Sequence, residues 1–284
     1  MDCPNECTDG VNLAHRHGVR TFTILLTFLA ATALAQPYGS TERKEYEKEP
    51  NGPHGECQSD WLRVADGLDY RAIQCLGDTR DLDVNVIRVD MRRYRLDLAS
   101  GNATSARRIA QTTDADFVIN ANFFDGAKRP LGAVTSSGTT IQDAKPNSWQ
   151  SIFLVTRDGT PKIILPSQWR TYRAKTWMAA QAGPRLVVAG HTNRVHQSYS
   201  AARAGVCIAK DGSVLFFATP QQRKLDMYEI TRVTRRGPED GGLGCQDAML
   251  FDGGHSTQIY LEGDTKRVTI DGDPVPVFVY AKRK

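Results

Sequence analysis

The residues best suited to chemistry form a short polar run near the C-terminal end of the sequence. Between the apolar residues 248–251 and a short predicted strand at 258–261 lie a carboxylate, two glycines, an imidazole and two hydroxyls: Asp252, Gly253, Gly254, His255, Ser256 and Thr257. Adjacent glycines permit positive φ and a close approach of the backbone to a ligand, and such a turn can direct N–H groups at an anion. The alternative interpretation is a hairpin turn that uses Asp and Gly for conformational reasons alone.

Further polar residues fall at the ends of other predicted strands. They are Asn120, Asn122 and Asp125 within the run INANFFD (residues 119–125), then Arg185 and Arg203. Asp125 precedes a glycine and also fits a simple turn, and the two arginines also fit solvated or structural ion pairs. Phe123 and Phe124 favour a place in the core over a sugar-stacking surface.

The elements expected to position these residues are mostly strands. Alternating hydrophobic residues predict strands over residues 68–75, 84–98, 117–120, 186–189 and 275–280, with residues 90–93 as the turn of a hairpin. Asp-Gly pairs predict hairpins that join 151–155 to 162–165 and 206–209 to 214–218. Residues 104–114, with Thr104 as N-cap and Ile109 in the core, and residues 225–235 fit short helices. This pattern predicts one α+β domain with a largely antiparallel or mixed β-sheet and a few helices.

Length and composition are those of a globular protein. The chain has 284 residues, of which 40% are hydrophobic and 24% charged, enough for a sizeable core. A formal net charge of +4 is compatible with an anionic ligand but is too small and dispersed to indicate nucleic acid as a partner.

The N-terminal region has the pattern of a secretory signal. Residues 21–35 contain no charge, follow two arginines and end in Ala-Leu-Ala, which predicts a signal peptide over residues 1–35. The alternative is an uncleaved membrane anchor, although the run is shorter than the roughly 20 residues of a spanning helix. Acidic residues within 1–18 are unusual for a signal and suggest a start site near Val19. A polar segment, 36–56, is predicted to be a flexible linker before a domain at 57–284.

An exported chain is expected in the extracellular space or periplasm, without a stable membrane span after cleavage. Four cysteines would remain: Cys57, Cys75, Cys207 and Cys245. In an oxidising compartment they predict two disulfides, with three possible connectivities. Cys57–Cys75 and Cys207–Cys245 are favoured because each pair flanks its own local unit. The spacing does not resemble zinc ligation, so no metal is expected.

Several of these runs resemble, in order, the motifs of the phosphodiester glycosidase family, which includes many exported bacterial proteins. INANFFD with the later PLG (130–132) resembles its asparagine-aromatic signature, and GPRLV (183–187) is similar to its middle motif. RAGV (203–206) with KDG (210–212), and GCQDA (244–248) through Ser256, resemble its arginine strand with Asp-Gly hairpin and its terminal Asp-Gly-Gly motif. The chain departs from the pattern at Asn122 and His255, where glycine is common. These departures bear on substrate identity more than on the fold.

The resemblance implies hydrolysis of a sugar-1-phosphodiester or related glycosidic bond in an envelope or extracellular glycan, with no cofactor. Such a bond requires an acid for the leaving oxygen or a carboxylate to stabilise positive charge on the ring. Asp252 is the expected catalytic carboxylate, as nucleophile or base, and Asp125 is the candidate for its partner. Whether the reaction retains or inverts depends on a carboxylate separation that a sequence does not give.

The remaining polar residues are expected to bind substrate. A phosphodiester is already a good leaving group, so its charge must be held, and Arg185 and Arg203 can do so through bidentate hydrogen bonds. The other expected contacts are Asn120 and Asn122 to sugar hydroxyls, backbone N–H groups of Gly253 and Gly254, and the side chains of His255 and Ser256.

Other classes of protein fit the sequence less well. A serine hydrolase requires G-x-S-x-G, and the run around Ser256 lacks the second glycine. A zinc hydrolase of the HExxH type has no matching motif. The main alternative is an exported carbohydrate-binding or cell-envelope interaction protein that has the same fold without turnover. Replacement of Asp252 by Asn separates the two, because only hydrolysis should be lost.

Overall fold

The computed structural model describes residues 60–76, 79, 81–193, 195 and 199–284. Residues Glu49–Lys284 form one compact unit. The predicted signal peptide (1–35), the predicted linker (36–56) and Cys57 lie outside the described residues. Within the described part of the chain, no helix has both the length and the hydropathy of a membrane-spanning segment.

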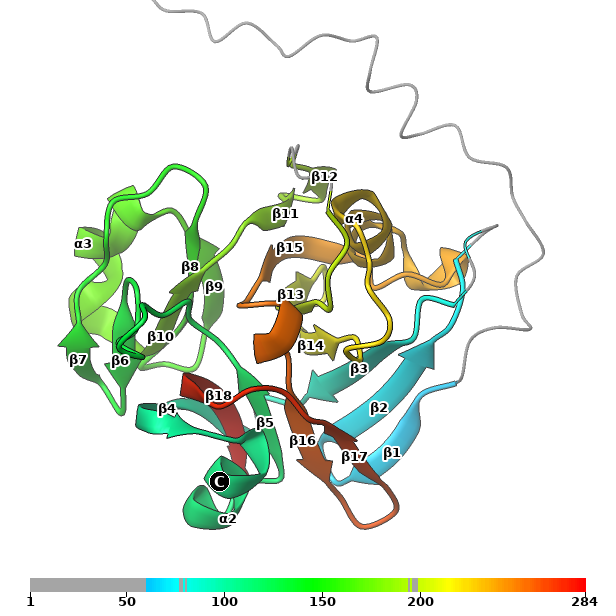
Figure 1. Ribbon diagram of the computed structural model, residues 1–284, viewed down its shortest axis with the longest axis horizontal. Coiled ribbons are helices and arrows are strands. Elements are labelled where there is room, and N and C mark those ends of the chain that lie inside the picture. The colour runs from blue at the N-terminus through cyan, green and yellow to red at the C-terminus, as the bar shows by residue number, and fades with distance from the viewer. Residues whose placement is uncertain (1–59, 77–78, 80, 194, 196–198) are drawn as a thin grey trace, which may run out of the picture. The chain divides into compact units, whose positions relative to one another are not determined.

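Three antiparallel sheets make up most of the fold (Figure 1). The first has eight strands in the spatial order β1 (Leu62–Ala65), β2 (Leu68–Ile73), β3 (Val84–Val89), β14 (Val214–Ala218), β13 (Ala204–Ala209), β15 (Cys245–Leu250), β11 (Arg185–Val188) and β12 (His191–Thr192). The second has the order β7 (Thr139–Gln142), β6 (Val134–Ser136), β10 (Thr176–Ala182), β8 (Ser151–Thr156) and β9 (Pro161–Ile164). The third has the order β17 (Arg267–Ile270), β16 (Ile259–Glu262), β5 (Phe117–Asn120), β18 (Val275–Arg283) and β4 (Tyr94–Thr104).

Few helices accompany the sheets, so the predicted α+β class is confirmed. The α-helices are α2 (Ala106–Thr113), α3 (Trp169–Tyr172) and α4 (Met227–Arg235). Single 3₁₀ turns are η1 (Pro166–Gln168), η2 (Arg173–Lys175), η3 (Pro238–Asp240) and η4 (Gly254–Ser256). In Figure 1, α2 lies at the third sheet and α4 beside β11 and β15.

The predicted N-cap of the first helix is wrong by one residue. Ser105, not Thr104, is the N-cap, and its side chain accepts a hydrogen bond from the Arg108 N–H. Thr104 is instead the last residue of β4, where it pairs with Val275 of β18. Strand pairing therefore determined where the helix begins. Helix α4 likewise begins after Asp226, which forms a capping box with Glu229, because Leu225 pairs with Ala201 in an isolated bridge.

The predicted hairpin over residues 84–98 is also wrong in its pairing. A turn does separate β3 from β4, but β3 pairs with β2 and β14 whereas β4 pairs with β18. The turn is thus a corner between two sheets. Hydrophobic alternation shows which face of a strand is buried but not which strand lies beside it. The two hairpins predicted from Asp-Gly pairs are confirmed as β8–β9 and β13–β14.

The three sheets enclose a common apolar core. Phe153 of β8, Phe216 of β14 and Phe251 after β15 belong to it, and their ring centroids lie 6.0 to 6.5 Å apart. Strand β8 is buried at every position, consistent with its nearly continuous apolar sequence. Phe251 directly precedes Asp252, so the core fixes the backbone from which this carboxylate projects.

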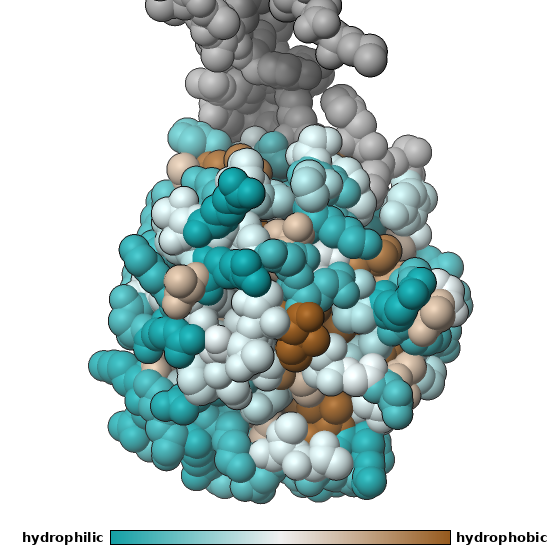
Figure 2. Space-filling view, turned by 90° about the vertical axis from the view of Figure 1, so that its left-hand side faces the viewer, coloured by the Kyte–Doolittle hydropathy of each residue, from teal (hydrophilic) through white to brown (hydrophobic). Residues whose placement is uncertain are grey.

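The predicted disulfide Cys207–Cys245 is present and joins β13 to β15, with Cα atoms 5.5 Å apart. Cys75 is disulfide-bonded as well, and its predicted partner Cys57 lies outside the described residues. Figure 2 shows the face on the left of Figure 1, where polar side chains predominate and hydrophobic ones occur in small isolated groups. Such scattered exposure is ordinary for a protein surface.

Candidate active site

Asp252 lies where the chain passes from one sheet to another. Strand β15 ends at Leu250 in the eight-stranded sheet, and β16 begins at Ile259 in the third sheet. The intervening turn, with η4 at its centre, is therefore not the tip of a hairpin. A purely conformational role as a hairpin turn is thereby removed for this Asp-Gly-Gly run.

Backbone hydrogen bonds anchor this turn to both neighbouring sheets. The N–H groups of Asp252 and Gly254 donate to the carbonyls of Ala121 and Ala202, each at 2.8 Å. A Cβ atom at Gly253 would lie 2.8 Å from the Ala202 oxygen, and Gly254 has φ +60°, so both glycines are required by local geometry. Because the Gly254 N–H is already bonded, it is not free to bind an anion.

Two side-chain amides hold the turn, one at both of its ends and the other within it. Asn120, at the end of β5, is fully buried; it donates to the Asp252 carbonyl at 2.7 Å and accepts from the Gln258 N–H at 3.0 Å. Gln221, in the loop after β14, donates to the carbonyls of Gly254 and Thr257 at 2.9 and 3.1 Å. The structure therefore places Asn120 as a support of the turn, and Gln221 is a second support that the sequence did not indicate.

The Asp252 carboxyl group is in an environment that disfavours its charge. Burial raises its pKa to about 6, although hydrogen bonds from the Ser256 side chain and the Gly253 backbone and the charge of Lys128 oppose the shift. Within the described part of the chain, Asp252 has no arginine or lysine partner in an ion pair. Asp252 is partly buried, and a partly buried carboxyl group that titrates near neutrality at a cleft is a frequent property of catalytic acids and bases.

Asp252 lines a cleft of about 220 Å³. The other residues that line it include Arg203, Phe123, Trp149 and Tyr199. Among the described residues that line this cleft, Asp252 is the only carboxylate. The cleft therefore combines one carboxylate, one guanidinium and four aromatic residues, Phe251 being the fourth.

Arg203 is the predicted arginine that reaches the cleft. It is 4% exposed, and its Nε and Nη2 atoms donate to the carbonyls of Leu225 and Tyr199 at 2.9 and 2.8 Å. Burial lowers the pKa of this guanidinium. The Tyr199 side chain opposes this shift through its charge and through a hydrogen bond with the guanidinium.

Arg185 does not line the cleft. Its Nη2 atom forms an ion pair with Asp247 at 2.8 Å and lies 3.4 Å from the Ile163 carbonyl. Gly183 and Pro184, the preceding residues of the same motif, do line the cleft. The structure therefore separates this motif into a cleft-lining backbone and an arginine held in a structural ion pair.

Asp125 lies in a tight turn of its own. Its carboxylate accepts hydrogen bonds from the N–H groups of Ala127 and Arg129, both at 2.9 Å, and from Arg129 Nε at 2.8 Å. The Arg129 backbone N–H, followed by its side chain, lowers the pKa of Asp125. Asp125 is not among the residues that line the cleft, so the structure does not bring the two predicted catalytic carboxylates together there.

The other predicted contacts take up varied positions. Asn122 is 1% exposed, and its Nδ2 atom donates to the Ala133 carbonyl at 3.0 Å. His255 is exposed on η4, and its carbonyl accepts from the Asp273 N–H at 2.7 Å. Ser256 contributes the hydrogen bond to Asp252 described above. None of these three residues lines the cleft.

Trp149 and Tyr199 line the cleft but were not predicted. Trp149 lies in a polar segment between β7 and β8, and an isolated tryptophan in such a loop is a usable signal in the sequence. Tyr199 has no comparable signal, because its position beside Arg203 depends on the backbone path. Phe123, predicted as a core residue, packs on the core and lines the cleft at the same time.

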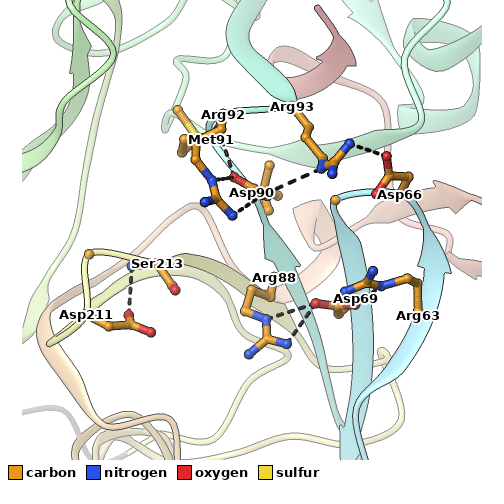
Figure 3. Close-up of a pocket in the computed structure, with 13 residues that line it drawn as sticks. Arg63, Asp66, Asp69, Arg88, Asp90, Met91, Arg92, Arg93, Asp211 and Ser213 are labelled. Atoms are coloured by element: carbon orange, nitrogen blue, oxygen red, sulfur yellow. Dashed lines mark hydrogen bonds and ion pairs between the residues drawn. The ribbon is translucent and has the colours of Figure 1, made fainter.

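A second and larger hollow, of about 690 Å³, lies at the turns that end β1, β3 and β13 (Figure 3). Four arginines and four aspartates line it: Arg63, Arg88, Arg92, Arg93, Asp66, Asp69, Asp90 and Asp211. Asp69 pairs with Arg63 and Arg88, Asp90 pairs with Arg92, and Arg93 pairs with Asp66. Its charges are therefore largely satisfied within the hollow itself.

Solved structures of two other proteins share this fold. The catalytic domain of zebrafish N-acetylglucosamine-1-phosphodiester alpha-N-acetylglucosaminidase, auto-inhibited by its pro-peptide, matches with a TM-score of 0.60 and 12% identity, over 82% of this chain and 86% of that one. A hypothetical protein from Synechocystis matches with a TM-score of 0.56 and 14% identity, over 81% of this chain. The match spans 64% of the length of the Synechocystis protein.

Sequence comparison defines the family directly. No curated protein sequence matches the chain. The profile of the phosphodiester glycosidase family matches residues 113–281, which include Asn120, Arg203, the whole Asp252 turn and most of β18. This match extends over more than half of the sequence and contains the cleft-lining carboxylate and guanidinium. The chain therefore belongs to the phosphodiester glycosidase family.

Proposed function

We propose that this protein hydrolyses a sugar-1-phosphodiester or a related glycosidic bond, with Asp252 as the catalytic carboxylate. The observation that carries the proposal is the state of Asp252, whose pKa is raised by burial to about 6 and which lines the same cleft as Arg203. Family membership supports glycosidase chemistry, and the zebrafish enzyme of the same fold acts, by its name, on a sugar phosphodiester.

The bond to be broken joins the anomeric carbon of a sugar to an oxygen of the phosphate. Its electron pair leaves with the phosphate, and ionised Asp252 either attacks the anomeric carbon or removes a proton from the attacking water. Either route consumes one water and releases a sugar hemiacetal and a phosphate monoester. The Arg203 guanidinium is proposed to donate to the departing phosphate, whose low basicity reduces the need for an acid.

This mechanism requires only one carboxylate at the cleft, which agrees with the separate position of Asp125. We assign Asp125 to the stability of the turn at 125–129, through its bonds to Ala127 and Arg129. Asn120 and Gln221 would hold Asp252 in place rather than contact sugar. Ser256 would adjust the acidity of Asp252 through its hydrogen bond.

We further propose that the protein acts outside the cytoplasm, in the periplasm or the extracellular space, on a glycan of the envelope or its surroundings. The Cys207–Cys245 disulfide supports this location, because structural disulfides persist mainly in oxidising compartments. The apolar run at residues 21–35 supports it from the sequence.

The test is turnover of a panel of aryl glycosides and sugar-1-phosphodiesters by the purified chain. Asp252→Asn should remove turnover, whereas Asp125→Asn should retain most of it because that side chain lies outside the cleft. Asp211→Asn is the matched control, since Asp211 also precedes a glycine in a turn. Equal loss in Asp125→Asn, with the fold retained by circular dichroism, would reinstate a two-carboxylate mechanism. A folded wild type without turnover would favour a carbohydrate-binding protein.

A further inference from the structure

Two large aromatic side chains at the cleft remain unusually open to solvent. Trp149 is 47% exposed and Tyr199 is 58% exposed, and both line the cleft that contains Asp252. Exposure of a large aromatic surface is unfavourable in water unless a partner covers it. Their common location at one cleft indicates a ligand with an apolar face.

Hydrogen bonds of the Trp149 backbone and of neighbouring residues hold the segment around Trp149 in place. Buried Gln181 donates to the Lys145 carbonyl at 2.7 Å and to Gln150 Oε1 at 2.9 Å, which ties the segment before β8 to β10. The Trp149 N–H donates to Asn147 Oδ1 at 3.0 Å. These contacts fix the backbone on both sides of Trp149 while its ring stays accessible, so little conformational entropy would be lost on binding.

The Trp149 ring is also supported from within the cleft. Its centroid lies 5.5 Å from that of Phe123, at an interplanar angle of 55°. Phe123 packs on the apolar core and thus connects the exposed ring to the rigid interior. An aromatic pair of this geometry adds attraction beyond that of the area it buries.

Tyr199 is coupled to the cleft arginine. Its carbonyl accepts from Arg203 Nη2 at 2.8 Å, and its ring centroid lies 5.3 Å from Arg203 Cζ. The arginine therefore orients Tyr199 through these two contacts, and the guanidinium itself lines the cleft. An aromatic surface and a cationic donor are thus held together in one wall.

We propose that Trp149 and Tyr199 form the sugar platform of this cleft, which binds the C–H face of a pyranose ring whose anionic substituent contacts Arg203. The inference rests on the proposed function, because it assigns a position to the sugar of that substrate. One face of a pyranose presents several C–H groups with few hydroxyls, and such a surface packs on an aromatic ring. Trp149 and Tyr199 are in this view determinants of sugar affinity, separate from the chemistry at Asp252.

The test measures binding without hydrolysis, in the Asp252→Asn background of the full chain. Glucose 1-phosphate, mannose 1-phosphate and galactose 1-phosphate are titrated by calorimetry into this parent and into versions that also carry Trp149→Ala, Trp149→Phe or Tyr199→Ala. Trp149→Ala should weaken the best-bound sugar about tenfold, equivalent to about 1.4 kcal/mol. Tyr199→Ala should weaken it by a smaller factor, and Trp149→Phe should retain most of the affinity.

The matched control is Tyr228→Ala. Tyr228 is also exposed, and its ring lies 5.3 Å from Arg232 Cζ, yet it does not line the cleft. Its replacement should leave affinity unchanged. Failure of the parent to bind any of the three sugar phosphates would overturn the inference, as would equal affinity in Trp149→Ala and Tyr228→Ala.

This experiment separates the inference from the proposed function. A wild type that hydrolyses sugar phosphodiesters with the same KM in Trp149→Ala would leave the function intact and remove the platform. Sugar binding that depends on Trp149, in a chain with no turnover, would retain the platform and remove the hydrolase. Thermal unfolding of every variant checks that each change acts at the cleft.

Discussion

The two hollows of this protein contain the same kinds of charged residue in opposite electrostatic states. In the larger hollow, which is lined by four arginines and four aspartates (Figure 3), Asp90 accepts hydrogen bonds from Arg92 Nε and Nη2 at 3.0 and 2.9 Å. These bonds lower its pKa to about 2. In the cleft, burial raises the pKa of Asp252 to about 6. A carboxylate that is already paired has no capacity left for chemistry at neutral pH, whereas an unpaired and buried one has.

The larger of the two hollows is not the candidate active site. It has a volume of about 690 Å³, against about 220 Å³ for the cleft, but its charged side chains bind one another. The cleft differs because, among the described residues, no arginine or lysine forms an ion pair with its carboxylate.

The largest effect is expected from paired replacement of the two carboxylates. Asp252→Asn should lower kcat by at least about a thousandfold, the order seen when a catalytic carboxylate is removed from a hydrolase. Asp90→Asn should leave kcat close to that of wild type, because the charge of Asp90 is neutralised by its ion pair with Arg92. Steady-state hydrolysis of the best substrate in the panel measures both, and a comparable loss in the two variants would contradict the contrast.

The same pair should differ in stability with opposite signs. The folded-state pKa of Asp252 is about 6 and the unfolded value is about 3.9, so the folded chain binds more protons between these values. Ionised Asp252 therefore destabilises the fold above pH 6, by at most about 3 kcal/mol, and this cost disappears as pH falls towards 4. Urea unfolding should show Asp252→Asn more stable than wild type at pH 8, with the gap closing at pH 4.

Asp90 provides the reverse case. Its pKa is lowered to about 2, so its ion pair stabilises the fold above the unfolded pKa and the stabilisation fades as pH falls towards 2. Asp90→Asn should be slightly less stable than wild type at neutral pH. A stability change of the same sign in both variants at pH 8 would show that burial does not determine the state of Asp252.

A smaller effect is expected from the support of the turn. Gln221→Ala removes the donors to the Gly254 and Thr257 carbonyls, a loss of about 1–3 kcal/mol when a group stays buried. We expect kcat to fall about tenfold and the pH at half-maximal kcat to move, because the surroundings of Asp252 change. Gln222→Ala, an exposed neighbour, is the control. An unchanged pH profile would show that Gln221 has no influence on Asp252.

The smallest effect concerns a distant cation. If ionised Asp252 is the active form, kcat/KM should rise with pH through about 6. Lys128 lowers the pKa of Asp252, so Lys128→Gln should move this midpoint to higher pH. Lys162→Gln, on β9 and away from the cleft, should not. A midpoint that moves to lower pH in Lys128→Gln would show that Lys128 does not act through charge.

Local signals in the sequence predicted local structure well. Both Asp-Gly hairpins were found because turn chemistry is specified by adjacent residues, and the Asp252 turn was found because its composition is unusual. Asp125 was assigned to catalysis although Arg129, four residues later, is its partner. That pairing is short-range and was accessible to prediction.

Long-range partners were the part that a single sequence could not supply. Arg185 was predicted to hold phosphate, but β15 brings Asp247 beside it. Strands β3 and β4 were joined in one hairpin because their alternation does not encode their neighbours. Trp149 and Tyr199 meet at the cleft only because β8 and β13 belong to sheets that pack together.

Because the Asp252 turn connects two sheets, its unfolding should be tied to the separation of those sheets. The Asp252 and Gly254 amides are bonded to Ala121 and Ala202, each outside the turn, so neither proton can exchange with solvent unless these junctions open. Their exchange should therefore require an opening almost as extensive as global unfolding. We therefore expect no separate melting transition for the Asp252 turn, and a chain that keeps its sheets together should keep this turn intact.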